Sequence, residues 1–351
     1  MPPAFSSPRQ AAAVALLLLL TLLSPVLIGK SLLPSREQMY SAQGWFMGWI
    51  DFPYLHQQIF EEKGDIDIAF MGASRMGAGI DASYVQEKLS EKLGRPAVVR
   101  SLTWTWDGYD ALYLSVSDLL QHRKVRMIIC SDLIPANPSY MGIANPIANC
   151  WFRYADNADM MDGLPMRAQV SLYASAILGM PRNIVGMLRP NLGATDYTIF
   201  DHYLSTFDYT QPAPQGAPEV CIYSEATKAN FKFDGTPIPA MQLALIRKIG
   251  DLAREHQTQM VCLHLPASAE WGSSVIEERA YWPEAFQGNV AMFGVVPSNL
   301  FAGMTAEQAH KLFYDEPHKS NSTHLNQYGL KYFTTYLTPG VVQLYEEQTK
   351  P

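Results

Sequence analysis

The chain has 351 residues, of which 48% are hydrophobic and 17% are charged, and its formal net charge is −7. A chain this apolar can bury a substantial core, which excludes intrinsic disorder as its main state. Acidic residues outnumber basic ones, whereas nucleic-acid binding normally needs a basic face. We therefore expect no nucleic-acid partner. The four cysteines are far apart, with no CxxC and no His at ligand spacing. We therefore expect neither a structural zinc site nor a small disulfide-stapled fold.

Residues 11–29 form an uncharged apolar run, AAAVALLLLLTLLSPVLIG. As a helix rising about 1.5 Å per residue, this run nearly spans a hydrocarbon core about 30 Å thick. The competing interpretations are a cleaved signal peptide and an uncleaved anchor, and the absence of an Ala-x-Ala site after the run favours the anchor. We expect a single-pass inner or plasma membrane protein with residues 1–10 as a cytoplasmic tail and the remainder periplasmic or extracellular.

In such a compartment the cysteines could oxidise. Cys130 and Cys262 sit in apolar runs typical of buried strands, which leaves Cys150 and Cys221 as the pair to test.

Residues 30–60 are aromatic and irregular, with Trp45, Phe46, Trp49 and Tyr54 among them. Interfacial aromatics of this kind lie at a membrane surface, so a juxtamembrane arm is one interpretation. An apolar arm that packs on the globular domain is the other, and the residues do not decide between them.

From residue 65 the chain alternates between strand and helix patterns. Apolar runs predict strands at 65–72, 96–104 and 125–133, and apolar residues at helical spacing predict helices at 81–94 and 110–124. Asp81 stands at the N-cap position of the first helix and Gly94 at its end. Alternation over short distances indicates βαβ units and a parallel sheet.

The alternation stops at 136–235, which is rich in Pro, Gly, Asn and Tyr and contains one convincing helix, at 167–180. We interpret this segment as an insertion. The α/β pattern then resumes, with helices predicted at 239–256, at 304–315 (from a capping box of Thr305 and Gln308) and from 324 onward, and strands at 259–267 and 289–297. The predicted architecture is one α/β domain, 61–135 with 236–351, in which helices flank a parallel sheet.

The strongest candidate for chemistry is FMGASRMGAGID at 70–81. Ser74 comes directly after a predicted parallel strand, and Gly72 permits a tight turn there. Ligands bind beyond the carboxyl ends of such strands, and backbone N–H groups in the turn can stabilise an oxyanion. The glycines form neither a GxGxxG nor a P-loop, so we expect no nucleotide and no other cofactor.

A nucleophilic serine needs a base, and the base needs an orienting partner. The segment YDEPHKSNSTHLNQYGLKYFT at 314–334 offers two histidines, His318 and His324, beside Asp315 and Asn321.

Together these two segments resemble the SGNH (GDSL-like) hydrolase superfamily. The first block is Gly72-Ala73-Ser74 followed by Arg75, and the second resembles the DxxHxNxxGxxxFT form of the family. Its matching residues are His324, Asn326, Gly329, Phe333 and Thr334. The resemblance implies a three-layer, flavodoxin-like fold with Ser74 as nucleophile and His324 as general base.

The chain departs from the family pattern in two places. Asn321 stands where the family has its acid, whereas Asp315 stands three residues before His318. Either Asp315 or Asn321 could orient His324, and His318 is the alternative base. The family completes its oxyanion hole with a Gly block and a Gly-x-Asn block, and here Gly108 and Asn137 are the nearest candidates by position, beside Gly72.

An N-terminal anchor joined to such a domain also resembles proteins that work beside membrane-bound O-acyltransferases, in alginate O-acetylation and in D-alanyl transfer to teichoic acid. The resemblance implies an esterase or O-acyltransferase that acts on a cell-envelope or secreted polysaccharide, with an O-acyltransferase as partner. Two alternatives are a catalytically impaired relative that binds polymer or scaffolds such a complex, and an assembly protein without an active site. Asn321 also begins an N-x-T sequon, and a glycan there would block His324, so these two interpretations exclude each other.

Overall fold

The computed structural model describes residues 7–27, 52–104, 109–131, 158–170, 220–235, 240–278, 291–314 and 323–348, together with residues 37, 173, 174, 177 and 238. The chain divides into two compact units, Met1–Gly48 with Ser139–Ala194, and Trp49–Pro138 with Thr195–Pro351. Each unit is described by itself.

A six-stranded sheet forms the centre of the second unit. Its strands, in order across the sheet, are β2 (Val99–Thr103), β1 (Ile66–Gly72), β3 (Val125–Ser131), β6 (Gln259–Leu263), β8 (Ala291–Val295) and β4 (Val220–Ile222). All neighbours pair in parallel except β8 with β4, which is antiparallel. The first five strands follow the order of flavodoxin-type doubly wound sheets, in which ligands bind beyond the carboxyl ends of the strands where the winding reverses, here between β1 and β3.

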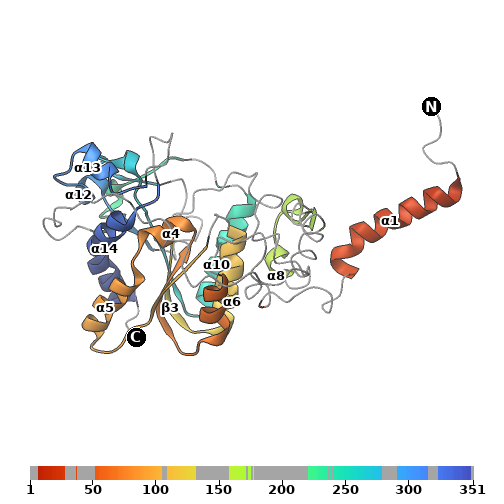
Figure 1. The fold of residues 1–351 in the computed structure, drawn as a ribbon, viewed down its shortest axis with the longest axis horizontal. Helices are drawn as coiled ribbons and strands as arrows, with labels where there is room; N and C mark the ends of the chain where they lie inside the picture. Colours follow the sequence, from red (N-terminus) through yellow and green to blue (C-terminus); the bar gives the residue numbers. More distant parts are fainter. Residues whose placement is uncertain are drawn as a thin grey trace. The chain divides into compact units, whose positions relative to one another are not determined.

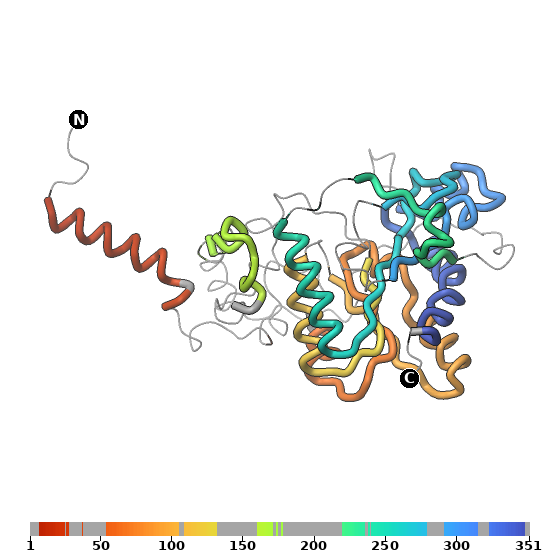
Figure 2. The backbone as a smooth tube through the Cα atoms, turned by 180° about the vertical axis from the view of Figure 1, so that it is seen from behind, coloured from red at the N-terminus to blue at the C-terminus, as the bar shows by residue number. Residues whose placement is uncertain are grey.

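Helices cover both faces of this sheet (Figure 1). On one side lie α5 (Ala82–Leu93) and α14 (Gln327–Gln348), and on the other lie α6 (Tyr109–His122) and α10 (Ala240–Glu255). Figure 2 shows α5 and α14 side by side although they come from opposite ends of the unit's sequence. Because both faces are covered, every residue of β1 is buried, as in other parallel strands that read as continuous apolar runs.

Short elements complete the structure. In the second unit these are α3 (Phe52–His56), η1 (Gln57–Glu61), α4 (Ser74–Gly79), η5 (Lys228–Asn230), β5 (Phe231–Phe233), η6 (Ser268–Glu270), β7 (Ile276–Glu278), α12 (Pro297–Leu300) and α13 (Ala306–His310). The first unit contains α1 (Pro8–Leu27) and α8 (Ala158–Met161). The strands β5 and β7 pair in parallel as a separate two-stranded sheet.

The predicted α/β class with a mostly parallel sheet is confirmed. Each strand and helix predicted in the two α/β segments forms, with bounds within a few residues except at 304–315, where α13 ends early at His310. Asp81 accepts a hydrogen bond from the Tyr84 N–H and Gly94 adopts a left-handed conformation, as an N-cap and a helix stop should. The capping box of Thr305 and Gln308 also forms.

The segment 136–235, predicted as an insertion, contributes β4 to the central sheet. This strand has three residues and pairs only at the sheet edge, so it leaves no periodic signal in the sequence. Of the predicted helix 167–180, residues 167–170, 173, 174 and 177 are described and are helical, and the remainder lies outside the described residues.

The apolar run at 11–29 is largely helical, within α1. No helix among the described residues is both long and apolar enough to cross a membrane, so the predicted transmembrane helix is not found in this structure. Ten large apolar side chains of α1 are exposed: Val14, Leu16, Leu17, Leu18, Leu19, Leu20, Leu22, Leu23, Val26 and Leu27.

The predicted aromatic arm at 30–60 is described as a continuous segment only from residue 52. There, Leu55 and Ile59 are fully buried, and η1 packs against α6 of the same unit. Trp45, Phe46 and Trp49 lie outside the described residues.

The cysteines of β3 and β6 are buried, as their apolar surroundings predicted. Cys130 and Cys262 are register partners, and their Sγ atoms lie 3.5 Å apart. Cys221 is buried too, and its Sγ accepts a hydrogen bond from Asn230 Nδ2 at 3.1 Å. Cys150 lies outside the described residues, so its proposed pairing with Cys221 stays a prediction.

A buried carboxylate joins the first strand to the last helix. Asp67 on β1 accepts hydrogen bonds from both terminal nitrogens of Arg95 (2.6 and 3.1 Å), from the Val98 N–H (2.9 Å) and from the Tyr345 hydroxyl (2.5 Å). Burial alone would raise the pKa of Asp67, but these donors outweigh it and hold that pKa below its ordinary value. Burial and the bond to Asp67 together raise the pKa of Tyr345 to about 12.

We expect Tyr345→Phe to lower the free energy of unfolding by about 1.5 kcal/mol at pH 7, because it removes a hydrogen bond to a charged, buried group. The pKa of Asp67 is lower in the folded state, so the ionised carboxylate stabilises the fold above the unfolded pKa, and this contribution is lost as the pH falls through the folded pKa. The difference between the two proteins should therefore shrink at acidic pH. Urea unfolding of the full-length protein at pH 7 and pH 3 measures this, with Tyr84→Phe as a control that should change little. A loss of equal size at both pH values would contradict it.

Candidate active site

The candidate nucleophile, Ser74, lies at the junction between β1 and α4. Gly72 ends the strand and Ser74 is the first residue of the helix. A Cβ atom on Gly72 would stand 2.8 Å from the Oγ of Ser131, at the end of the neighbouring β3, and 3.3 Å from the Cβ of Met76, so glycine fits this turn with the least displacement of its neighbours. The Ser74 N–H is in the first helical turn, where no preceding carbonyl of the helix can accept it. It is therefore a candidate donor to an oxyanion.

The candidate base lies just before α14. The chain at this point forms an isolated bridge, Phe313 with Leu325, and the Tyr314 N–H donates to the His324 carbonyl at 3.0 Å. This backbone pairing fixes the position from which the imidazole of His324 extends.

The Asn of the predicted HxNxxG pattern holds the same segment. The side chain of Asn326 is buried; its Oδ1 accepts the N–H groups of Tyr328 and Gly329 at 3.0 and 3.1 Å, which caps α14. Its Nδ2 donates to the carbonyls of Lys311 and Phe313 at 2.8 and 3.1 Å. Asn326 thus ties the start of α14 to the chain after α13.

Gly329 and Thr334 complete this arrangement. A Cβ on Gly329 would stand 2.0 Å from the Leu312 carbonyl oxygen, so only glycine lets α14 approach so closely. The Thr334 hydroxyl accepts the Asp81 N–H at 3.0 Å, which joins α14 to the start of α5, and Phe333 is buried in the core. The motif residues after His324 therefore act as a scaffold that sets where the histidine lies.

Ser74 and His324 meet in the structure. Ser74 Oγ lies 2.8 Å from His324 Nε2, and both residues are half-buried. Where Nε2 accepts the serine hydroxyl, the ring proton is on Nδ1, which lies 3.3 Å from the Thr323 hydroxyl. This is the geometry of a nucleophile and its base. The contact with Thr323 was not predicted. The only sequence feature that could have indicated it is that Thr323 directly precedes His324.

The other predicted site residues lie outside the described residues. These are Asp315, Asn321 and His318, from which the orienting partner or alternative base was to come, and Gly108 and Asn137, the predicted oxyanion donors. The choice between Asp315 and Asn321 accordingly stays a prediction.

A second histidine, His264, follows β6 and is buried. His264 lies between two carboxylates, with Nδ1 2.7 Å from Glu278 and Nε2 2.9 Å from Glu270. Burial alone would lower the pKa of His264, but the two carboxylates outweigh it and raise that pKa well above its ordinary value. An imidazolium that donates from both nitrogens holds η6 and β7 against the end of β6. Within the described part of the chain, no group of three or more His, Cys, Asp or Glu side chains could hold a metal ion.

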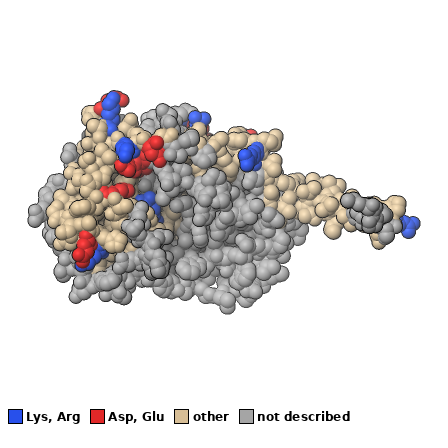
Figure 3. Space-filling model, turned by 90° about the horizontal axis from the view of Figure 1, so that it is seen from above, with Lys and Arg blue, Asp and Glu red and all other residues tan. Residues whose placement is uncertain are grey.

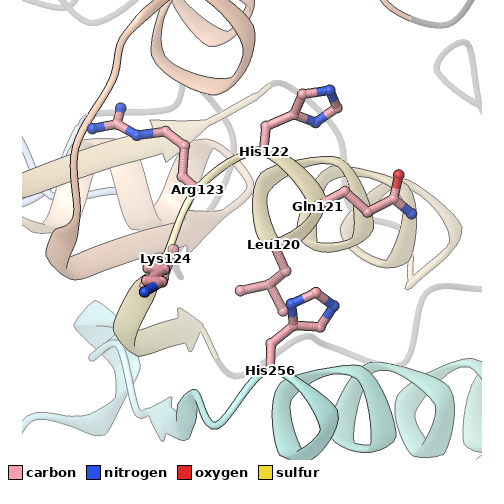
Figure 4. Close-up of a pocket in the computed structure, with 7 residues that line it drawn as sticks. Leu120, Gln121, His122, Arg123, Lys124 and His256 are labelled. Carbon is pink, nitrogen blue, oxygen red and sulfur yellow. The ribbon is translucent and has the colours of Figure 1, made fainter.

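A cavity of about 290 Å³ lies at the opposite edge of the sheet, where α6 ends and β3 begins. In Figure 4, Leu120 and His256 face each other across it, whereas the side chains of His122 and Arg123 point apart. The basic groups therefore do not converge on one ligand. On the face that Figure 3 shows, the described Lys and Arg residues are interspersed with Asp and Glu, and they form no continuous patch of positive charge.

No protein-family model matches the chain, and no curated protein matches its sequence.

We expect Gly329→Ala to lower the free energy of unfolding by about 3 kcal/mol, since its Cβ would overlap the Leu312 carbonyl oxygen, a backbone atom that cannot rotate away as a side chain can. The matched control is Gly303→Ala, whose Cβ meets nothing within 4 Å and whose positive φ alone should cost about 1 kcal/mol. Chemical denaturation of both variants compares them. Equal losses would mean that close approach at Gly329 does not hold the histidine segment.

Proposed function

We propose that this chain is a serine esterase or O-acyltransferase that uses Ser74 as nucleophile and His324 as general acid and base. The observation that carries the proposal is the 2.8 Å contact between Ser74 Oγ and His324 Nε2 at the carboxyl edge of a doubly wound sheet. A contact this short is what deprotonation of the serine hydroxyl requires, and it favours an enzyme over an impaired relative.

In the proposed reaction Ser74 Oγ attacks the carbonyl carbon of an ester, and its proton moves to His324 Nε2. The tetrahedral oxyanion is stabilised by the Ser74 N–H and further donors. When the intermediate collapses, the ester C–O bond breaks, and His324 returns the proton to the departing alcohol. Water or a second alcohol then attacks the acyl-serine with His324 as base, so Ser74 is regenerated and the acyl group leaves as an acid or a new ester.

We propose a cell-envelope or secreted polysaccharide as the acyl donor or acceptor, with a membrane-bound O-acyltransferase as partner. This rests on the resemblance of the two sequence blocks, together with the apolar N-terminus, to proteins of alginate O-acetylation and teichoic acid D-alanylation.

We also propose that residues 11–29 attach the chain to a membrane, with the α/β unit outside the cytoplasm. The exposed leucines of α1 support this attachment. The protein should then sediment with membranes at alkaline pH and need detergent for release, whereas a variant without residues 1–30 should not. Release of the full-length protein by alkaline carbonate alone would contradict it.

The enzymatic proposal predicts that Ser74→Ala and His324→Ala each lower hydrolysis of p-nitrophenyl acetate by about 1,000-fold or more, because the two residues act as a unit. The assay uses the full-length protein, with an acetylated polysaccharide as second substrate. Ser90→Ala and His122→Ala are matched controls away from this edge and should retain wild-type activity.

Full activity in both site variants would eliminate the proposed pair. A wild-type protein that turns over neither substrate and binds acetylated polysaccharide with unchanged affinity after Ser74→Ala would favour the scaffold alternative.

A further inference from the structure

We propose that Arg75, the residue after the nucleophile, is a positioning residue that holds the loop of His324 against Ser74; this inference rests on the proposed function. The Arg75 guanidinium donates to two backbone carbonyls from separate parts of the chain. Nε donates to the Thr323 oxygen at 3.3 Å, and a terminal nitrogen donates to the Leu265 oxygen. Thr323 is the residue directly before His324.

The Leu265 carbonyl is a firm point of attachment. The preceding His264 extends β6, donating its N–H to the Phe293 carbonyl of β8 at 2.9 Å, and its imidazole is clamped by Glu270 and Glu278. The side chain of Leu265 is buried against Gly79 at the end of α4. Arg75 therefore ties the histidine loop to the rigid edge of the sheet.

The loop is held on both sides of the histidine. Asn326 fixes the chain after His324, and the Tyr314 N–H bonds to the His324 carbonyl. The Arg75 bond fixes the chain before it, at Thr323. With Asn326 on one side and Arg75 on the other, the Nε2 of His324 stays within reach of Ser74 Oγ.

An arginine suits this task better than a lysine. Its planar fork presents donors in two fixed directions, so one side chain can bond two carbonyls that approach from different segments. A lysine at this position could satisfy one of them. A displacement of the base by about 1 Å can cost about 100-fold in the rate of the step it catalyses.

The test measures the rate at which a fluorophosphonate labels Ser74 in the full-length protein, with the modified peptide identified by mass spectrometry. Arg75→Ala should slow labelling by about 100-fold and Arg75→Lys by about 10-fold. In a His324→Ala background, Arg75→Ala should slow labelling no further, because Arg75 acts through the histidine. Equal slowing in both backgrounds would overturn the proposal, since Arg75 would then act on Ser74 or the probe directly.

The matched control is Arg123→Ala. Arg123 also bridges two carbonyls, those of Gly64 (3.0 Å) and Gln58 (2.7 Å), but at the opposite edge of the sheet. Its loss should reduce thermal stability and leave the labelling rate of the folded protein unchanged. An equal fall in labelling for Arg123→Ala and Arg75→Ala would assign both to stability alone and contradict the positioning role.

The two proposals fail in different ways. Absence of label on Ser74 in the folded wild-type protein would count against the proposed function itself. Label in the wild type that depends on His324 but not on Arg75 would uphold the function and overturn the positioning role. Arg75→Lys is the variant to compare if Arg75→Ala fails to fold, because lysine keeps the positive charge at this position.

Discussion

The hydrogen bond between Ser74 Oγ and His324 Nε2 joins residues 250 positions apart in the sequence. The bond forms because Ser74 follows the end of β1, at the carboxyl edge of the sheet, and His324 lies at the same edge. His324 directly precedes α14, which packs beside α5. A doubly wound sheet reverses its winding between β1 and β3, which leaves that edge open to a ligand. The chemistry proposed for this chain depends on that one contact.

The residues around the contact serve mainly to hold it at bonding distance. Gly72 permits the close approach of the nucleophile turn to Ser131, and Gly329 permits that of α14 to Leu312. Asn326 and Arg75 fix the histidine segment from its two sides. Proton transfer from Ser74 to His324 needs this hydrogen bond to keep its length and angle, because small displacements of either residue weaken the bond steeply. The surrounding residues must therefore hold both side chains in place.

The sequence was most informative where local patterns and the global fold agree. The β1 run, the Asp81 cap and the Gly94 stop each carry a local signal, and they led to correct elements. The pairing of Ser74 with His324 was inferred from resemblance, since no local pattern reports a contact over such a separation. The strand β4 was missed because it is stabilised by its neighbour β8 and not by its own three residues. The clamp on His264 and the bridge of Arg75 depend on tertiary proximity, which spacing along the chain does not reveal.

The central claim is that Ser74 carries an acyl group during turnover. Its most direct measurement is the mass of the Ser74 peptide after the full-length protein is quenched in acid during reaction with p-nitrophenyl acetate. We predict an added acetyl group on Ser74 that is lost by hydrolysis once the substrate is removed, and that does not form in the His324→Ala variant. Hydrolysis by the wild-type protein with no acetyl group ever found on Ser74, or with the group on another residue, would contradict it.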